Sequence, residues 1–184
     1  MQASLSGEPQ KQGKGRAVSY QEHREKAPRS LSGAVITISD SRSEATDESG
    51  RTIRQKLEAN GHRVLFHTVL KNEAGDINRE IHRLLAQPEL KFIITSGGTG
   101  VSRRDITVET MRPLLEKEMD GFGELFRWLS YQEIGTASIM SRALAGAAQG
   151  KVIVCLPGSL GAVTLAMDRI ILPEIGHMVR EATR

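Results

Sequence analysis

The chain has 184 residues, 39% of them hydrophobic, which is enough for one domain with a substantial core. Its formal net charge of +3 comes from the N-terminus, where residues 1–30 hold six of the 25 Lys and Arg but only three of the 22 Asp and Glu. The remaining residues carry 19 charges of each sign and offer no net positive field, so nucleic acid is not expected as a partner. No run of about 18 apolar residues is present, which argues against a membrane partner as well.

Residues 1–30 are rich in Gly, Ser, Gln and Lys and lack apolar periodicity. Such a segment buries too little surface to offset its ordering entropy, so we predict a disordered tail before a folded domain at residues 31–184. The segment lacks the apolar stretch of a signal peptide, and a cytoplasmic protein is expected. The one cysteine, Cys155, lies in the apolar run KVIVCL, which predicts a buried and inert thiol.

Three β-branched apolar runs, at residues 34–39, 63–70 and 90–95, alternate with stretches of helical period. The first helix is expected to begin near Asp47 or Ser49, to place Ile53 and Leu57 inward, and to end at Asn60 and Gly61. The second is expected to be capped by Asp76, to bury Ile81, Leu84 and Leu85, and to end before Pro88. This βαβαβ order predicts a mostly parallel sheet covered by helices on both faces.

The pattern changes after residue 105. Thr107 is expected to cap a short helix, and Pro113 to begin another that ends at Asp120 and Gly121. A further helical stripe follows, made of Phe122, Leu125, Phe126 and Leu129.

Residues 143–148 and 151–156 are interpreted as two strands joined by a tight turn at Gln149 and Gly150. This hairpin would add one antiparallel strand to the sheet. The chain then returns to helix over residues 161–172, and a last helix is expected to begin at Pro173.

The segment SGGTGVSRRD, residues 96–105, follows the third strand. Gly97, Gly98 and Gly100 allow positive φ and close approach, so that successive amide N–H groups can form a concave anion site. Arg103 and Arg104 can neutralise a phosphate, and Asp105 can take the Mg²⁺ that accompanies a polyphosphate. The alternative is an ordinary glycine-rich turn with a solvated arginine pair.

Four motifs bring the sequence to a family: TISDSRS with DESG (37–50), TSGGTGVSRRDITVET (95–110), DGFGELFRWLSYQEIGTASIMSRALAG (120–146) and LPGS (156–159). Together, over residues 32–180, they resemble the MoaB/MogA family of molybdenum cofactor biosynthesis proteins, which includes the G domain of gephyrin. The resemblance implies a three-layer α/β/α domain in a homotrimer or a homohexamer. It also implies Mg²⁺-dependent adenylylation of molybdopterin by ATP.

The resemblance carries roles to particular residues. Asp105 matches the family's magnesium and catalytic aspartate. The matches to the phosphate-binding loop are Gly97, Gly98, Thr99 and Gly100. Matches to motifs that line the same cleft are Asp40, Ser49, Gly50, Pro157, Gly158 and Ser159. Ser141 and Arg142 match a pair expected to meet the pterin phosphate. Each has a plainer interpretation: Asp40 or Ser49 can cap a turn or helix, residues 157–158 can shape a loop, and Arg142 can pair with a surface carboxylate.

One position departs from the family. After the second strand, adenylylating members often carry an aspartate, whereas this chain has Asn72 followed by Glu73. An amide cannot supply a carboxylate's charge to Mg²⁺, although Glu73 can serve as the second catalytic carboxylate if the loop shifts. Two hypotheses therefore stand: an adenylyltransferase, and a non-catalytic oligomer that binds a pterin or a nucleotide.

Overall fold

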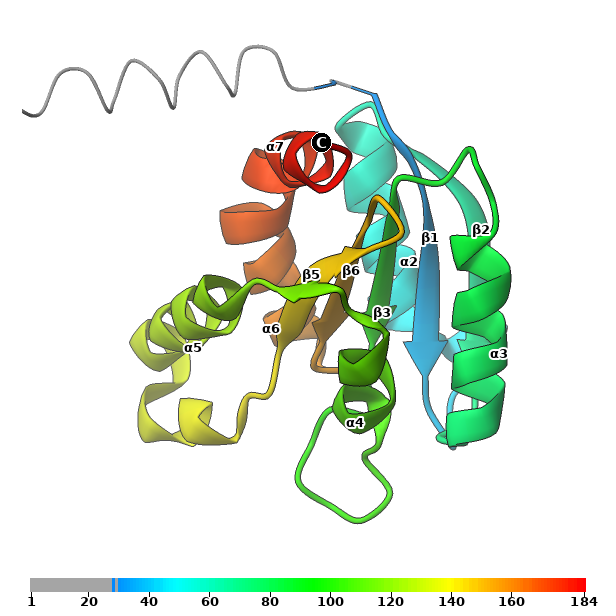
Figure 1. The fold of residues 1–184 in the computed structure, drawn as a ribbon. Helices are drawn as coiled ribbons and strands as arrows, with labels where there is room; N and C mark the ends of the chain where they lie inside the picture. The colour runs from blue at the N-terminus through cyan, green and yellow to red at the C-terminus, as the bar shows by residue number, and fades with distance from the viewer. Residues whose placement is uncertain (1–27, 29) are drawn as a thin grey trace, which may run out of the picture.

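A single mixed sheet forms the centre of the structure (Figure 1). The computed structural model describes Pro28 and residues 30–184, and in that part the strand order is β2-β1-β3-β6-β5-β4. The strands are β1 (Ser32–Ile38), β2 (Arg63–Leu70), β3 (Phe92–Ser96), β4 (Lys117–Glu118), β5 (Leu144–Ala148) and β6 (Lys151–Leu156). β2, β1, β3 and β6 pair in parallel, whereas β5 is antiparallel to both of its neighbours. The predicted mostly parallel sheet with one antiparallel strand is confirmed.

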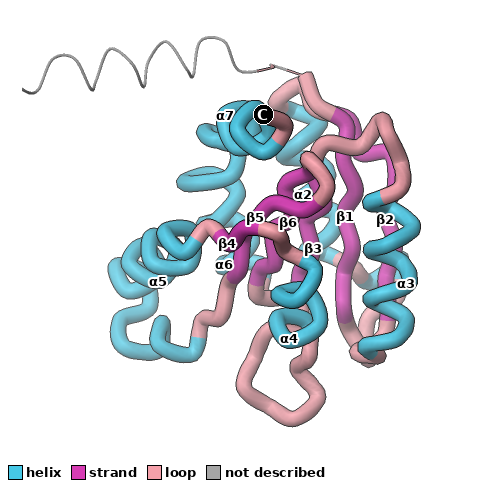
Figure 2. Tube along the Cα trace, in the orientation of Figure 1, coloured by secondary structure: helices cyan, strands magenta, loops and turns pink. Residues whose placement is uncertain are grey.

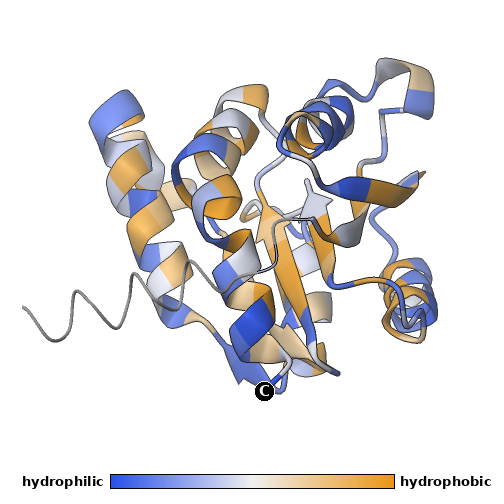
Figure 3. Cartoon of the chain, turned by 90° about the horizontal axis from the view of Figure 1, so that it is seen from above, coloured by the Kyte–Doolittle hydropathy of each residue, from blue (hydrophilic) through white to orange (hydrophobic). Residues whose placement is uncertain are grey.

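Helices cover both faces of the sheet, which gives the predicted three layers (Figure 2). On one face lie α2 (Glu48–Ala59), α5 (Asp120–Ile134), α6 (Leu160–Ala166) and α7 (Leu172–Ala182). On the other lie α3 (Ala74–Leu85) and α4 (Thr107–Met111). Seen from above, the central strands are hydrophobic along their length, while each helix combines hydrophobic and hydrophilic faces (Figure 3). The sheet is thus buried on both sides, as parallel sheets require.

The first two helices follow the sequence pattern closely. Asp47 caps α2 by accepting a hydrogen bond from the backbone N–H of Gly50, and the helix ends before Gly61, whose φ is 82°. The expected inward residues are buried: Ile53, Leu57, Ile81, Leu84 and Leu85. The predicted cap of α3 is wrong. Asp76 lies inside the first turn and pairs with Arg79, because the helix begins earlier, with Glu73 at the capping position.

Three further boundaries differ from the prediction. Thr107 does not cap α4 but is its first residue, and its hydroxyl donates instead to the carbonyl of Gly97. Pro113 lies in a single 3-10 turn, Arg112–Leu114, which is followed by the two-residue strand β4 rather than by a helix. Asp120 and Gly121 do not end a helix; they begin α5, because β4 pairs with β5 and the chain turns back immediately afterwards.

The last part of the chain agrees with the predicted hairpin and helices. Gln149 (φ 49°) and Gly150 (φ 69°) form the two-residue turn between β5 and β6, with both residues at positive φ. After α6 a π-helical segment, Met167–Ile171, leads directly into α7. Pro173 is the second residue of α7, directly after the π-helical segment.

Cys155 is fully buried in β6, and burial raises the pKa of its thiol to about 12, which agrees with the predicted inert thiol. Within the described residues, none of the helices has both the length and the apolarity of a membrane span. The predicted tail at residues 1–30 falls outside the described residues except at positions 28 and 30.

Candidate functional site

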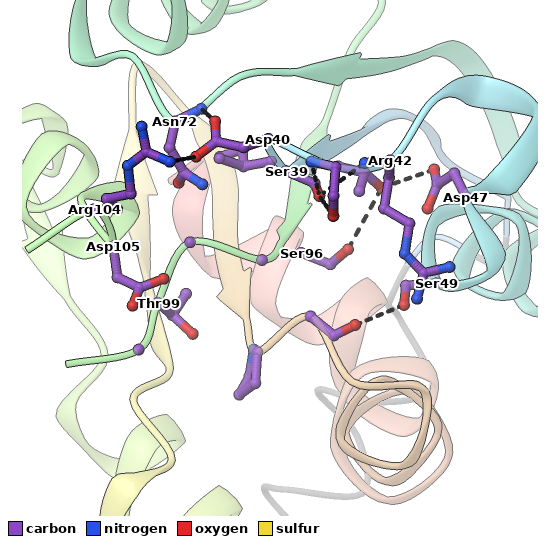
Figure 4. Close-up of a pocket in the computed structure, with 18 of the residues that line it drawn as sticks. Ser39, Asp40, Arg42, Asp47, Ser49, Asn72, Ser96, Thr99, Arg104 and Asp105 are labelled. Atoms are coloured by element: carbon purple, nitrogen blue, oxygen red, sulfur yellow. Dashed lines mark hydrogen bonds and ion pairs between the residues drawn. The ribbon is translucent and has the colours of Figure 1, made fainter. Parts of the chain in front are cut away.

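The carboxyl ends of β1, β3 and β6 meet at one edge of the sheet, because their register pairs Thr37 with Ser96 and Ser96 with Leu156. β2 and β3 flank β1 on opposite sides, so the chain changes direction there, the position at which open α/β sheets bind ligands. A cavity of about 530 Å³ lies at this edge (Figure 4). It is lined by residues that follow β1, β2, β3 and β6 and by the segment before β5.

The loop after β3 forms one wall of the cavity. Gly97 and Gly98 have φ of 97° and 62°, and a Cβ at residue 97 would lie 2.2 Å from the carbonyl oxygen of Ile38. Among the described residues, no hydrogen bond uses the backbone N–H of Gly98, Thr99 or Gly100. A run of unused amides next to close backbone packing is the arrangement that binds phosphate oxygens.

The same loop is anchored from below by α4. The buried hydroxyl of Thr107 donates to the carbonyl of Gly97 at 2.9 Å, and its backbone N–H donates to the carbonyl of Gly98 at 2.9 Å. The N–H of Gly97 donates to the carbonyl of Leu156 at 2.9 Å, which ties the loop to the end of β6. These bonds occupy the carbonyls of Gly97 and Gly98 and fix the position of the loop.

Charged side chains gather at one end of the cavity. Asp40 accepts a hydrogen bond from the backbone N–H of Asn72 at 3.1 Å and lies 3.6 Å from the guanidinium of Arg104 (Figure 4). Asp105 accepts from the backbone N–H of Ser102 at 3.1 Å, which orients its carboxylate against Gly100. Because Arg104 is largely exposed, its pairing with Asp40 is weak and its charge remains available to an anionic ligand.

Asn72 suits a cation that prefers oxygen ligands better than the sequence analysis indicated. Its side-chain oxygen is buried, has no hydrogen-bond partner among the described residues, and lies where a Cβ on Gly98 would be only 2.4 Å away. A buried amide oxygen without a partner is costly, whereas Mg²⁺ accepts amide oxygens, carboxylates and phosphate oxygens as ligands. Within the described residues no cluster of three or more His, Cys, Asp or Glu could hold a metal.

The opposite end of the cavity is built from hydroxyls around a buried carboxylate. Asp47 is 1% exposed and accepts hydrogen bonds from the Thr37 hydroxyl at 2.8 Å, from the Gly50 N–H at 2.8 Å and from His67 Nε2 at 3.0 Å. The hydroxyl of Ser49 donates to the carbonyl of Gly158 at 2.8 Å. β1, β2, α2 and the loop after β6 are therefore connected at this end.

Most of the expected site residues line the cavity together: Asp40, Ser49, Gly97, Gly98, Thr99, Gly100, Asp105, Ser141, Pro157 and Gly158. Four others, all within the described residues, lie outside the lining. Gly50 packs against the Asp47 carboxylate, and Ser159 caps α6. Glu73 precedes α3, and Arg142 pairs with Glu109, as its plainer interpretation held.

The sequence interpretation left out several lining residues, among them Thr37, Arg42, Asp47 and Ser96. Asp47 was assigned only as a helix start, since its capping role is local while its bond to His67 spans 20 residues. Arg42 carried a usable signal, because it lies within the TISDSRS motif that follows β1.

Comparison with known proteins decides the family. A family model described as a probable molybdopterin binding domain matches residues 34–177. The chain belongs to this molybdopterin-binding family. Among its relatives, molybdenum cofactor biosynthesis protein B of Halalkalibacterium halodurans is 48% identical over 165 residues, covering 89% of this chain and 97% of that protein. The protein of the same name from Bacillus subtilis is 44% identical over 165 residues, covering 89% and 97%.

Solved structures of the molybdopterin-binding family share the fold. A crystal structure of molybdenum cofactor biosynthesis protein B gives a TM-score of 0.82 at 41% identity, covering 85% of this chain and 98% of that one. The tungsten cofactor synthesizing protein MoaB from Pyrococcus furiosus gives 0.78 at 33% identity, covering 86% and 100%. The resemblance to the MoaB/MogA family is confirmed.

The anchoring of the glycine loop can be tested at Thr107. We expect Thr107→Val to lower the free energy of unfolding by about 1–3 kcal/mol, because the buried Gly97 carbonyl loses its donor while the side-chain volume hardly changes. Thr107→Ser keeps the hydroxyl and serves as the control. Urea denaturation of both variants measures the difference, and equal loss in the two would show that the hydroxyl does not anchor the loop.

Proposed function

We propose that the protein acts in molybdenum cofactor biosynthesis and transfers the adenylyl group of ATP to molybdopterin, releasing pyrophosphate. The observation that carries the proposal is the row of unused amides at Gly98, Thr99 and Gly100 beside the carboxylate of Asp105 in one cavity. The relatives named molybdenum cofactor biosynthesis protein B and the molybdopterin-binding family support the choice of pathway and of pterin. Because ATP and Mg²⁺ are abundant in the cytoplasm, we propose that location too.

The proposed reaction needs little acid–base chemistry. A terminal phosphate oxygen of molybdopterin attacks the α-phosphorus of ATP, the bond from that phosphorus to the α,β-bridging oxygen breaks, and pyrophosphate leaves. A phosphate monoester has a second pKa of about 6, so the attacking group is already mostly dianionic at neutral pH. The protein's contribution is to hold two anions in line with donors fixed in advance, for which the loop amides and Arg104 are suited.

The end of the cavity where the charged side chains gather, around Asp105 and Asn72, suits magnesium. Bound Mg²⁺ would supply charge neutralisation for the phosphate oxygens and for the departing pyrophosphate. We assign Asp105 as its carboxylate ligand and the partnerless oxygen of Asn72 as a neutral one. Ser141, which lines the cavity, is proposed to meet the pterin phosphate, whereas Arg142 would first have to leave Glu109.

A second candidate follows from Asn72. With an amide in place of a carboxylate, the cavity can bind a pterin or a nucleotide yet hold Mg²⁺ too weakly for turnover. Pyrophosphate release from ATP with Mg²⁺ and molybdopterin separates the two candidates: turnover supports the transferase, and tight binding of either ligand without turnover supports the binding protein.

Asp105→Asn is expected to remain folded and to bind molybdopterin, but to release pyrophosphate about 10²-fold more slowly, because the change keeps the shape and removes the charge that holds Mg²⁺. Asp76→Asn is the matched control, since Asp76 is an exposed helical aspartate that pairs with Arg79. Wild-type turnover in Asp105→Asn would remove this residue from the mechanism.

Asn72→Asp is expected to lower the Mg²⁺ concentration for half-maximal pyrophosphate release, since two anionic ligands hold a hard cation better than one. The added charge also lies near Asp40, so the variant's melting temperature should rise on Mg²⁺ addition more than that of wild type.

If the loop shifts so that Glu73 serves instead, Glu73→Gln should weaken magnesium dependence more than Asn72→Ala. A magnesium titration unchanged in both Asn72→Asp and Glu73→Gln would place this loop outside the metal site.

We also propose a homo-oligomer, a trimer or a hexamer, formed through α5. Phe122 and Phe126 are buried against their own sheet, but Trp128, Tyr131 and Ile134 each leave more than half of their surface exposed. Other apolar side chains on α5 or on elements that contact it are exposed as well: Leu125 on α5, Ile139 and Met140 in the 3-10 segment that follows it, and Leu160 in α6. Aromatic residues are enriched in interface cores, and an exposed patch of this kind is unusual on a monomer.

Sedimentation equilibrium at micromolar concentration is expected to give a mass that is a multiple of the 20.2 kDa chain. Trp128→Glu should shift the distribution toward one chain, because a buried charge at an interface has no partner. Leu65→Glu changes an exposed apolar residue on β2, away from the patch, and should leave the mass unchanged. A monomeric wild-type protein would refute the proposal.

A further inference from the structure

The buried Asp47 carboxylate does more than cap a helix. Its three hydrogen bonds come from β1, β2 and α2, and Gly50 is packed so tightly against it that a Cβ there would lie 2.1 Å from the carboxylate and 2.6 Å from His67 Nε2. A carboxylate accepts hydrogen bonds and donates none, so His67 must carry its proton on Nε2 to make this contact. His67 is therefore the donor in this contact and Asp47 the acceptor.

The direction of the remaining bonds follows from counting protons. A hydroxyl has a single proton to donate, and that of Thr37 goes to Asp47 while that of Ser49 goes to the carbonyl of Gly158. Ser96, whose hydroxyl oxygen lies 3.5 Å from that of Thr37, can then act only as the donor in this pair. Thr37 and Ser49 both line the cavity, and toward a ligand they can present only lone pairs.

The cavity thus has two ends of opposite hydrogen-bonding character (Figure 4). At one end Thr99 and Arg104 belong to the loop with unused amide donors; of the carboxylates there, Asp40 lies near Arg104 and Asp105 is the one assigned to Mg²⁺. At the other, Asp47 and Ser49 belong to a floor of acceptors. Arg42 lies on the acceptor side but is exposed, and one of its guanidinium nitrogens donates to the carbonyl of Thr46. The cation therefore sits at the rim, above a buried floor that is unfavourable for phosphate.

We propose that the acceptor end binds the N–H edge of an aminated nitrogen heterocycle, and that His67 is the positioning residue that fixes its polarity through Asp47. This inference rests on the proposed function for its two ligands, since adenine and pterin both carry a ring amino group. Phosphates then occupy the amide end, so the two ends together orient the molecule whose heterocycle the floor binds. His67 does not touch the ligand. It keeps the Asp47 carboxylate aligned, so that the Thr37 hydroxyl donates its proton to Asp47 and not to the ligand.

Equilibrium binding to the full chain tests this without turnover. The variants are Thr37→Val, which removes the hydroxyl at nearly constant volume, His67→Leu, which removes the donor to Asp47, and His67→Gln, whose amide nitrogen can replace Nε2. The probes are ATP with Mg²⁺, inorganic tripolyphosphate with Mg²⁺, and molybdopterin under anaerobic conditions. Melting temperatures are recorded for each variant.

Thr37→Val and His67→Leu are expected to weaken one heterocycle-bearing probe about tenfold, the effect of one hydrogen bond, while tripolyphosphate changes by less than about twofold. Loss of ATP binding assigns the floor to adenine, and loss of molybdopterin binding assigns it to the pterin. His67→Gln should bind all three probes as wild type does. This rescue separates positioning from a merely structural role.

Equal weakening of all three probes, weakened tripolyphosphate binding, or unchanged binding of every probe would each overturn the inference. If Thr37→Val does not fold, the contrast between His67→Leu and His67→Gln gives the same decision. The wild-type protein could release no pyrophosphate while the variants Thr37→Val and His67→Leu still lose binding selectively. That result would refute the adenylyltransferase and would still support the acceptor floor.

Discussion

The cavity depends on one backbone contact, between Gly97 and the carbonyl of Ile38. The loop that leaves β3 must cross the end of β1 to reach the cavity, and any side chain at residue 97 would collide with that carbonyl. On its other side the loop meets Gly158, where a Cβ would lie 3.1 Å from the Gly97 Cα. Three strand ends are thereby packed through main chain alone, which leaves the amides of the next residues free for a ligand.

This contact also explains how polar groups of different kinds share a small volume. The main chain supplies donors along the loop, and side chains from β1 and α2 supply acceptors on the opposite side. Neither set can rotate to suit the other, because the loop carbonyls are held by Thr107 and the Thr37 hydroxyl by Asp47. Preorganisation of this kind lowers the ordering cost when a polar ligand binds.

The sequence predicted those features that depend on neighbouring residues. The apolar runs located β1, β2 and β3, and Gln149-Gly150 located the hairpin, because strand burial and turn geometry are written in local residue types. β4 was missed because Lys117 and Glu118 are exposed and have no apolar pattern to read. The capping role given to Asp76 failed because α3 begins earlier, at Ala74, and that given to Thr107 failed because its hydroxyl donates to the carbonyl of Gly97, ten residues away.

The same distinction between local and long-range features applies to the site. The glycine loop and Asp105 lie within one motif, so their proximity could be predicted from the sequence. The Asp47–His67 contact joins residues on either side of α2, and no local pattern announces it. Likewise, the pairing of Arg142 with Glu109 depends on how the segment before β5 passes α4. Such placements follow from the packed fold and not from spacing.

The lone thiol gives the sheet a built-in reporter. Cys155 is fully buried in β6, the strand between β3 and β5. It lies two residues before Pro157, which lines the cavity. Because the thiol is fully buried, an alkylating reagent reaches it only when the strands around it separate. Its rate of alkylation in native buffer therefore reads the local opening equilibrium of the central sheet, without any engineered label. A ligand that holds the ends of β3 and β6 together would slow the alkylation of Cys155, although it does not contact the thiol.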